Sequence, residues 1–208
     1  MNNIEKAGFM EYPGDGSERL DSNTNDIGEL SLEKETTRHK VNREDEGREY
    51  GLLKSGLLDG SLSLEKVRDR LVELDQATPT RDAADENLQF LKDPQIVDYV
   101  NQHPDATEGY NHFLSFTEFH VAQRLTLDNP IEAISYFKMA LEDARATQSD
   151  SESWSAYVKG TLLYMEGKEI PEELIAKAEQ SKNAQILRSF NRGLKLRGFP
   201  SYLEDYIK

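Results

Sequence analysis

Apolar side chains recur along this chain at the spacing of an α-helix, and no stretch alternates apolar and polar residues convincingly, as a half-buried β-strand does. Two segments show the helical spacing with the same intervals: Leu64, Val67, Leu71 and Leu74, and then Ile134, Phe137, Leu141 and Ala144. Such a stripe gives a helix one apolar face, which must pack against another element. Because no strand is predicted, the sequence indicates an all-α fold built from packed helices.

Capping and helix-breaking residues divide the periodic part into separate helices. Ser63, Asp93 and either Asp128 or Asn129 stand where N-caps are expected, and Gly167 and Gly198 stand where helices end. Pro94 and Pro130 follow their caps as first-turn prolines. The pattern predicts a small hairpin around residues 59–61, short helices up to a stop at Pro104, and longer helices from Thr107 onward.

The first fifty residues have a different composition from the rest. They contain 13 acidic and 7 basic residues, and only 7 are Ile, Leu, Val or Phe. This apolar content is too low to offset the conformational entropy lost on folding. We therefore predict that residues 1–47 form a disordered acidic tail. An alternative for part of it is a short docking motif at Phe9-Met10-Glu11-Tyr12-Pro13, where aromatic and Met side chains are clustered.

Composition excludes several classes of function. The chain has 25 basic and 39 acidic residues, a net charge of −14, so its overall field repels nucleic acid and anionic membranes. It has no cysteine, which excludes disulfides and thiolate chemistry, and no apolar run long enough to span a bilayer.

Without a signal-peptide pattern, the expected location is cytoplasmic. No phosphate loop or nucleophile elbow occurs, so we predict a non-enzymatic protein without cofactor.

Histidine and glutamate concentrate in only one segment, at Glu108, His112, Glu118 and His120. His112 and His120 lie eight residues apart, about 12 Å along a helix, so they cannot bind one ion together. A metal or acid–base site would need ligands from another helix. The simpler interpretation is that these are polar positions on a packed helix, and no metal site is predicted.

Two segments carry a pattern of small and aromatic residues. Ala133, Phe137 and Ala140 lie on one predicted helix, and Tyr157, Gly160 and Tyr164 lie on the next. This pattern resembles the tetratricopeptide (TPR) family over about residues 111–197. The resemblance implies antiparallel helix pairs and a groove that binds a peptide or protein. A non-repeating helical bundle is the alternative, because it would bury the same residues. The expected organisation is the tail at 1–47, short helical hairpins at 48–105, and a TPR-like domain at 106–208.

The predicted helix at residues 182–197 is strongly basic, and no acidic residue occurs between Gln180 and Leu203. Arg188, Arg192 and Lys195 share one face at i, i+4 and i+7. One interpretation is a binding face for an acidic partner, which could be a protein or RNA. A second is charge balance, with pairing to Glu166, Glu169, Glu172 or Glu173 of the preceding helices. A third is that the acidic tail covers the stripe.

The C-terminal residues Phe199, Tyr202 and Tyr206 are aromatic and follow a helix-ending glycine. We predict that they dock onto the preceding helix and cap the last apolar face. The alternative is an exposed aromatic patch that binds a peptide.

These features together predict an interaction or adaptor module without catalytic activity. Its partner would be a peptide or protein bound in a helical groove, with no membrane association. The alternative is a small regulatory protein that binds RNA or an acidic partner through the basic helix at residues 182–197.

Overall fold

The computed structural model describes residues 47–77, 81–146, 151–178 and 182–206. These residues belong to one compact unit, Glu46–Lys208. The described residues form helices and contain no strand, which confirms the all-α prediction. The predicted disordered tail and its docking motif lie outside the described residues, except that Gly47 already belongs to a helix.

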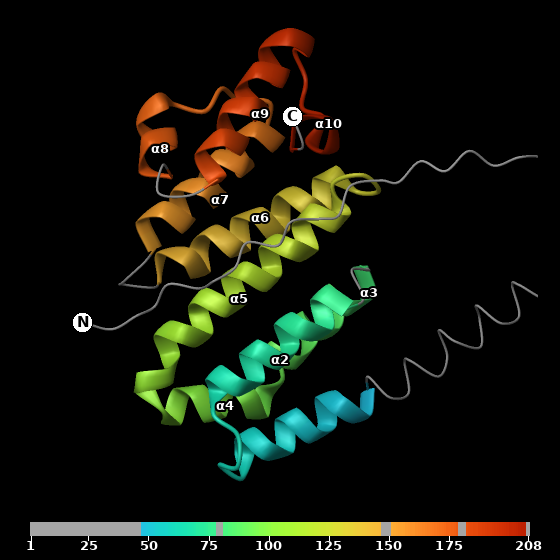
Figure 1. Cartoon of the computed structure of the whole chain (residues 1–208), viewed down its shortest axis with the longest axis vertical. Coiled ribbons are helices and arrows are strands. Elements are labelled where there is room, and N and C mark those ends of the chain that lie inside the picture. The colour runs from blue at the N-terminus through green and yellow to red at the C-terminus, as the bar shows by residue number, and fades with distance from the viewer. Residues whose placement is uncertain (1–46, 78–80, 147–150, 179–181, 207–208) are drawn as a thin grey trace, which may run out of the picture. The chain divides into compact units, whose positions relative to one another are not determined.

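The helices follow one another with short connections. A first helix at residues 47–58 is followed by nine labelled helices: α2 Leu64–Ala77, α3 Arg81–Leu91, α4 Pro94–Gln102, α5 Pro104–Leu125, α6 Pro130–Arg145, α7 Ser151–Met165, α8 Glu172–Lys177, α9 Asn183–Arg197 and α10 Tyr202–Tyr206. In Figure 1 the helices of residues 47–102 lie on one side of α5, and α7 to α10 gather on the far side of α6. The long helices α5 and α6 therefore form the middle of the unit.

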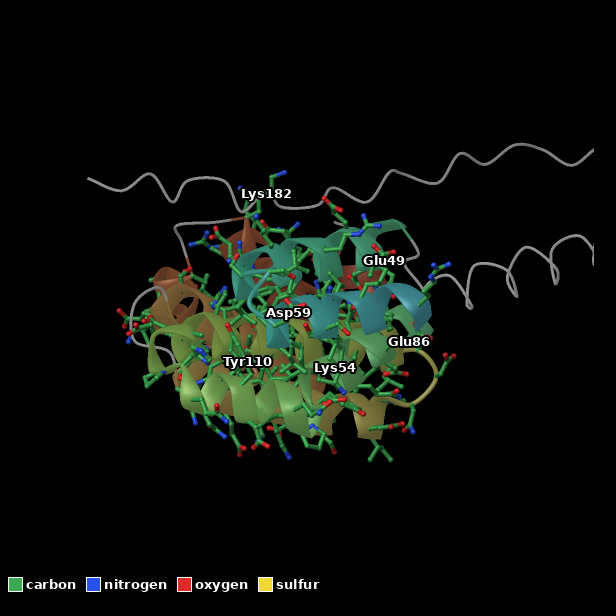
Figure 2. The ribbon with its side chains drawn as sticks, turned by 90° about the horizontal axis from the view of Figure 1, so that it is seen from below. Glu49, Lys54, Asp59, Glu86, Tyr110 and Lys182 are labelled. Carbon is green, nitrogen blue, oxygen red and sulfur yellow. The ribbon has the colours of Figure 1, made fainter. Side chains whose placement is uncertain are left out.

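The first two helices form the small hairpin that the sequence predicts. Gly60 has φ 78°, a left-handed conformation that favours glycine, and the Ser61 amide donates to Asp59 Oδ1 at 2.8 Å. The Arg70 guanidinium pairs with Glu49, so the start of the first helix lies beside α2. Figure 2 shows Glu49 and Asp59 along this hairpin.

The predicted caps are formed. Asp93 accepts a hydrogen bond from the Gln95 amide at 2.9 Å, and Asn129 accepts one from the Glu132 amide at 3.3 Å. Pro104 differs from the prediction: it opens α5, which the sequence pattern started only at Thr107. A first-turn proline fits there because the first amides of a helix have no intrahelical acceptor.

Phe119 and Phe137 pack at the centre of the long helices. Their ring centroids lie 5.1 Å apart, and Phe119 also approaches Trp154 and Tyr157 of α7 at 5.1 and 5.2 Å. Phe137 is fully buried, and so are the small residues Ala133 and Ala140 on the same face of α6. The predicted burial of Phe137 is therefore confirmed.

Helices α7 and α9 approach each other at Gly160. A Cβ at this position would lie 2.7 Å from the Leu187 side chain, so a larger residue would require that side chain to shift. One turn later, Tyr164 stacks on Phe190 with ring centroids 4.3 Å apart. Tyr157, Gly160 and Tyr164 are all buried, as the sequence pattern indicated.

The C-terminal helix docks through two of the three aromatic residues predicted to do so. Tyr202 is buried, and Tyr206 is half-buried against Phe190 at 6.3 Å between ring centroids. The docking prediction is wrong for Phe199, which is 58% exposed. Phe199 follows Gly198, whose left-handed φ of 78° ends α9 and turns the chain before α10 begins.

The core runs across the predicted domain boundary between residues 105 and 106. Ile96 and Val100 of α4 belong to the same buried cluster as Tyr110 and Phe113 of α5. The Tyr110 hydroxyl also donates to the Leu91 carbonyl at 2.7 Å. The short hairpins and the longer helices therefore share one core in the described residues. None of the described helices combines the length and apolar character needed to cross a membrane.

Candidate functional site

Helix α9 has a packed face and an outer face. Leu187, Phe190 and Leu194 are buried against the rest of the unit, and Gly193 lies directly under Asp205 of α10. The predicted stripe lies on the opposite side, where Arg188, Arg192 and Lys195 are all exposed. The amphipathic pattern of the helix has therefore placed three cations together on the surface.

Two of the three cations are paired with glutamates from the neighbouring segment. Arg188 Nη2 lies 3.4 Å from Glu172 Oε1, and Lys195 Nζ lies 2.6 Å from Glu169 Oε1. Arg192 forms no ion pair with any residue that the structure describes. These glutamates are among those expected for a charge-balancing stripe. All four paired side chains are exposed, however, and exposed ion pairs contribute only about 0–1 kcal/mol.

Large apolar side chains lie exposed where α9 turns into α10. Leu196 is 78% exposed, Phe199 is 58% exposed and Leu203 is 46% exposed. The Arg197 guanidinium lies 5.9 Å from the centre of the Phe199 ring. Arg197 also pairs with Asp205, which fixes the turn against α10. The end of the basic helix is thus apolar as well as basic.

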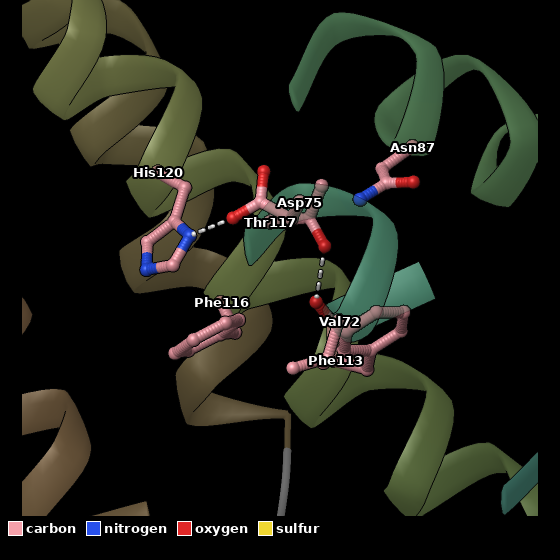
Figure 3. Close-up of a pocket in the computed structure, with 7 residues that line it drawn as sticks. All are labelled: Val72, Asp75, Asn87, Phe113, Phe116, Thr117 and His120. Atoms are coloured by element: carbon pink, nitrogen blue, oxygen red, sulfur yellow. Dashed lines mark hydrogen bonds and ion pairs between the residues drawn. The ribbon is translucent and has the colours of Figure 1, made fainter. Parts of the chain in front are cut away.

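Asp75 forms a second cluster with His120 and Arg124. Asp75 Oδ2 lies 3.0 Å from His120 Nδ1 (Figure 3). Asp75 Oδ1 accepts from Arg124 Nη1 at 2.8 Å. Burial opposes ionisation of Asp75, but the hydrogen bonds from His120 and Arg124 outweigh it and lower its pKa. The cluster ties α2 to α5.

A small recess adjoins Asp75 and His120. Its walls come from α2, α3 and α5, and Figure 3 shows the lining residues: Val72, Asp75, Asn87, Phe113, Phe116, Thr117 and His120. It holds about 200 Å³ of empty space, part of which is open solvent. Asn87 is itself engaged by Tyr50 and by the Leu71 carbonyl, so the recess offers little for a ligand to bind.

Glu118 is a buried carboxyl in the middle of α5. It is 1% exposed; its Oε1 pairs with Lys92 Nζ at 2.8 Å, and its Oε2 has no hydrogen-bond partner among the described residues. Burial raises the pKa of Glu118 to about 7, Lys92 opposes the rise, and Asp143 of α6 adds to it. Asp143 also has a raised pKa, mainly through burial. The two carboxyls can form a hydrogen bond once one of them is protonated.

The histidines of the one His/Glu segment are used in packing. His120 binds Asp75, and the His112 ring lies edge-on to Trp154 with centroids 6.2 Å apart. Within the described ranges, no three His, Asp or Glu side chains are grouped closely enough to hold a metal ion.

Sequence reasoning missed the buried acids Asp75 and Asp205, and it grouped Glu118 with the other polar positions of a packed helix without identifying its burial. Glu118 carried a signal, since it is an acid inside the strongly apolar stretch from Tyr110 to Leu125. The partners of Asp75 lie 45 and 49 residues away, a separation that no local pattern reveals.

A comparison with known protein families, curated proteins and solved structures finds no significant match. The TPR resemblance therefore stays a prediction.

Proposed function

We propose that this chain is a non-enzymatic interaction module, and that a protein or peptide partner binds the outer face of α9. The observation that carries the proposal is the exposed row of Arg188, Arg192 and Lys195 on a protein of net charge −14. Arginine suits a carboxylate partner because its planar guanidinium donates two hydrogen bonds at once. Helix α9 presents these groups on a rigid element, since its other face is packed against the core.

The ion pairs on this face are weak enough for a partner's carboxylates to replace the glutamates. Glu169 and Glu172 hold Lys195 and Arg188 in exposed pairs, so little free energy is lost when a partner's carboxylate replaces them. Arg192, between the two pairs, has no ion-pair partner among the described residues to displace. The face is therefore ready to bind an acidic segment without unfolding any part of the unit.

Replacing Arg188, Arg192 and Lys195 together with glutamine tests the proposal. We expect the affinity for a short labelled peptide of Glu-Glu-Leu repeats to fall by about ten- to a hundredfold, while the melting temperature changes little. Fluorescence anisotropy measures the first quantity and circular dichroism the second. The melting temperature should hold because the three side chains are exposed and their pairs are weak.

A matched control removes the same charge elsewhere. Lys138, Arg145 and Lys168 are also exposed bases, and changing them to glutamine should leave the peptide affinity within about twofold of the parent's. Equal loss in both triple variants would contradict the proposal, because it would show a net-charge effect. Unchanged affinity with lost stability in the α9 variant would leave only a charge-balancing role for the stripe.

The salt dependence of binding distinguishes RNA, the alternative partner, from a peptide. Phosphate contacts release bound counterions, so RNA binding weakens steeply as salt rises. A peptide held by a few carboxylates and apolar contacts weakens much less. Tighter binding to a single-stranded RNA than to the peptide, with a steep salt slope, would favour the regulatory RNA-binding alternative over the proposal.

A further inference from the structure

The basic face of α9 continues into exposed apolar surface. Leu196 follows Arg192 by four residues on α9, so the two side chains are neighbours on one face of the helix. Phe199 comes just after the helix, beside the guanidinium of Arg197. The other bulky apolar or aromatic side chains of α9 and α10 are buried or half-buried, apart from Leu203. Leu196, Phe199 and Leu203 are thus side chains that the described helices leave exposed, and we call them the apolar end of the α9 face.

We infer that the partner is an acidic peptide segment that also carries apolar side chains, with its carboxylates on the stripe and its apolar groups on Leu196 and Phe199. This inference rests on the proposed function and specifies its partner. Charge complementarity favours an acidic partner segment, because no acidic residue interrupts the chain from Gln180 to Leu203. Burial of Leu196 and Phe199 on binding supplies the apolar part, as in helix-in-groove and aromatic-anchor recognition.

Acidic side chains around this surface favour a short peptide over an extended anion. Glu169 and Glu172 lie beside the stripe, and Glu204 lies 3.5 Å from Arg197 near the apolar end. All three are exposed. A flat anionic membrane or a long nucleic acid would meet these carboxylates as well as the cations and would be repelled by them. A narrow peptide can lie between these carboxylates and contact only the cations and the apolar end.

The experiment compares two peptides on the full chain, one of Glu-Glu-Leu repeats and one of Glu-Glu-Ser repeats. We expect the leucine peptide to bind about ten- to a hundredfold more tightly, from the apolar area it buries. In the double variant Leu196→Ser and Phe199→Ser, this preference should disappear while the serine peptide binds as before. The variant should fold normally because both side chains are exposed, and circular dichroism checks this.

A matched control makes the same change at another exposed apolar pair, Leu127→Ser and Ile131→Ser near the turn between α5 and α6. The control should keep the full preference for the leucine peptide. Equal affinities of the two peptides for the parent, or a preference that survives the Leu196 and Phe199 changes, would overturn the inference while leaving the proposed function intact. If neither peptide binds, the proposed function fails. Tighter binding to phosphatidylserine vesicles or to RNA than to the leucine peptide would also overturn the inference.

Discussion

Replacing Phe137 with alanine is expected to lower the free energy of unfolding by about 3–5 kcal/mol, the range for truncating a buried aromatic side chain. Phe137 is fully buried, and its ring lies 5.1 Å from Phe119 of α5 and 6.2 Å from Tyr202 of α10, measured between centroids. One side chain of α6 therefore contacts both the central helix and the C-terminal helix. The backbone around a cavity at this position can collapse only in part, since both contacts come from packed helices.

Urea denaturation followed by circular dichroism measures this effect, and the melting temperature should fall by about 10 °C. Ile131→Ala is the matched control, because Ile131 lies on the same helix and is 80% exposed. The control should change the unfolding free energy by no more than about 0.5 kcal/mol. A Phe137→Ala variant that unfolds together with the control would show that α6 does not pack as described.

The second large effect is a pH dependence of the free energy of unfolding, and Glu118 is its source. An ordinary glutamate has a pKa of 4.5, whereas burial raises the pKa of Glu118 to about 7 in the folded protein. The folded state therefore binds a proton more tightly than the unfolded state does between these two values. This contribution to the unfolding free energy is fully present below pH 4.5 and is lost as the pH rises to about 7. Its size is on the order of a few kcal/mol, because a difference of one in pKa corresponds to about 1.4 kcal/mol of free energy and Glu118 titrates together with Asp143.

Glu118→Gln should remove this dependence, because glutamine stays neutral and can still donate a hydrogen bond toward Asp143. The difference in unfolding free energy between variant and parent should shift in favour of the variant by a few kcal/mol on going from pH 4.5 to above pH 7. Urea denaturation at a series of pH values measures it. Asp98→Asn, at an exposed position on α4, is the matched control and should change the unfolding free energy by no more than about 0.5 kcal/mol. A Glu118→Gln curve parallel to the parent's would contradict the assigned environment of Glu118.

Local chemistry is what made most helices predictable. Asp93 and Asn129 cap helices that start with proline, and Gly198 ends α9 in a left-handed conformation. Each of these features depends only on neighbours within a few residues. The periodic apolar spacing likewise identified the buried face of α6 through Ala133, Phe137 and Ala140. Such signals are local, so a single sequence contains them.

Contacts between distant segments were not predictable in the same way. Asp75 meets Arg124 across 49 residues, and Asp205 meets Tyr164 across 41 residues. No spacing rule connects such pairs, because the packing of whole helices brings them together. Phe199 was misplaced for a related reason: an aromatic residue favours burial by composition, but the turn at Gly198 directs it away from the core.

The candidate binding face was predictable from the sequence only in part. Helical spacing alone placed Arg188, Arg192 and Lys195 on one face, and their exposure in the structure agrees with that. The apolar end formed by Leu196, Phe199 and Leu203 became visible only with the fold, since similar leucines elsewhere in the chain are buried. Whether such a residue is covered depends on how whole helices pack against one another, which the local spacing of residues does not reveal.

An amide NMR titration of the full chain with the Glu-Glu-Leu peptide tests most directly whether α9 carries the binding face. The predicted result is a set of saturable shift changes concentrated in residues 185–203, with the largest at Arg192 and Leu196. Binding that shifts the recess around Asp75 and His120 instead, with α9 unchanged, would contradict it.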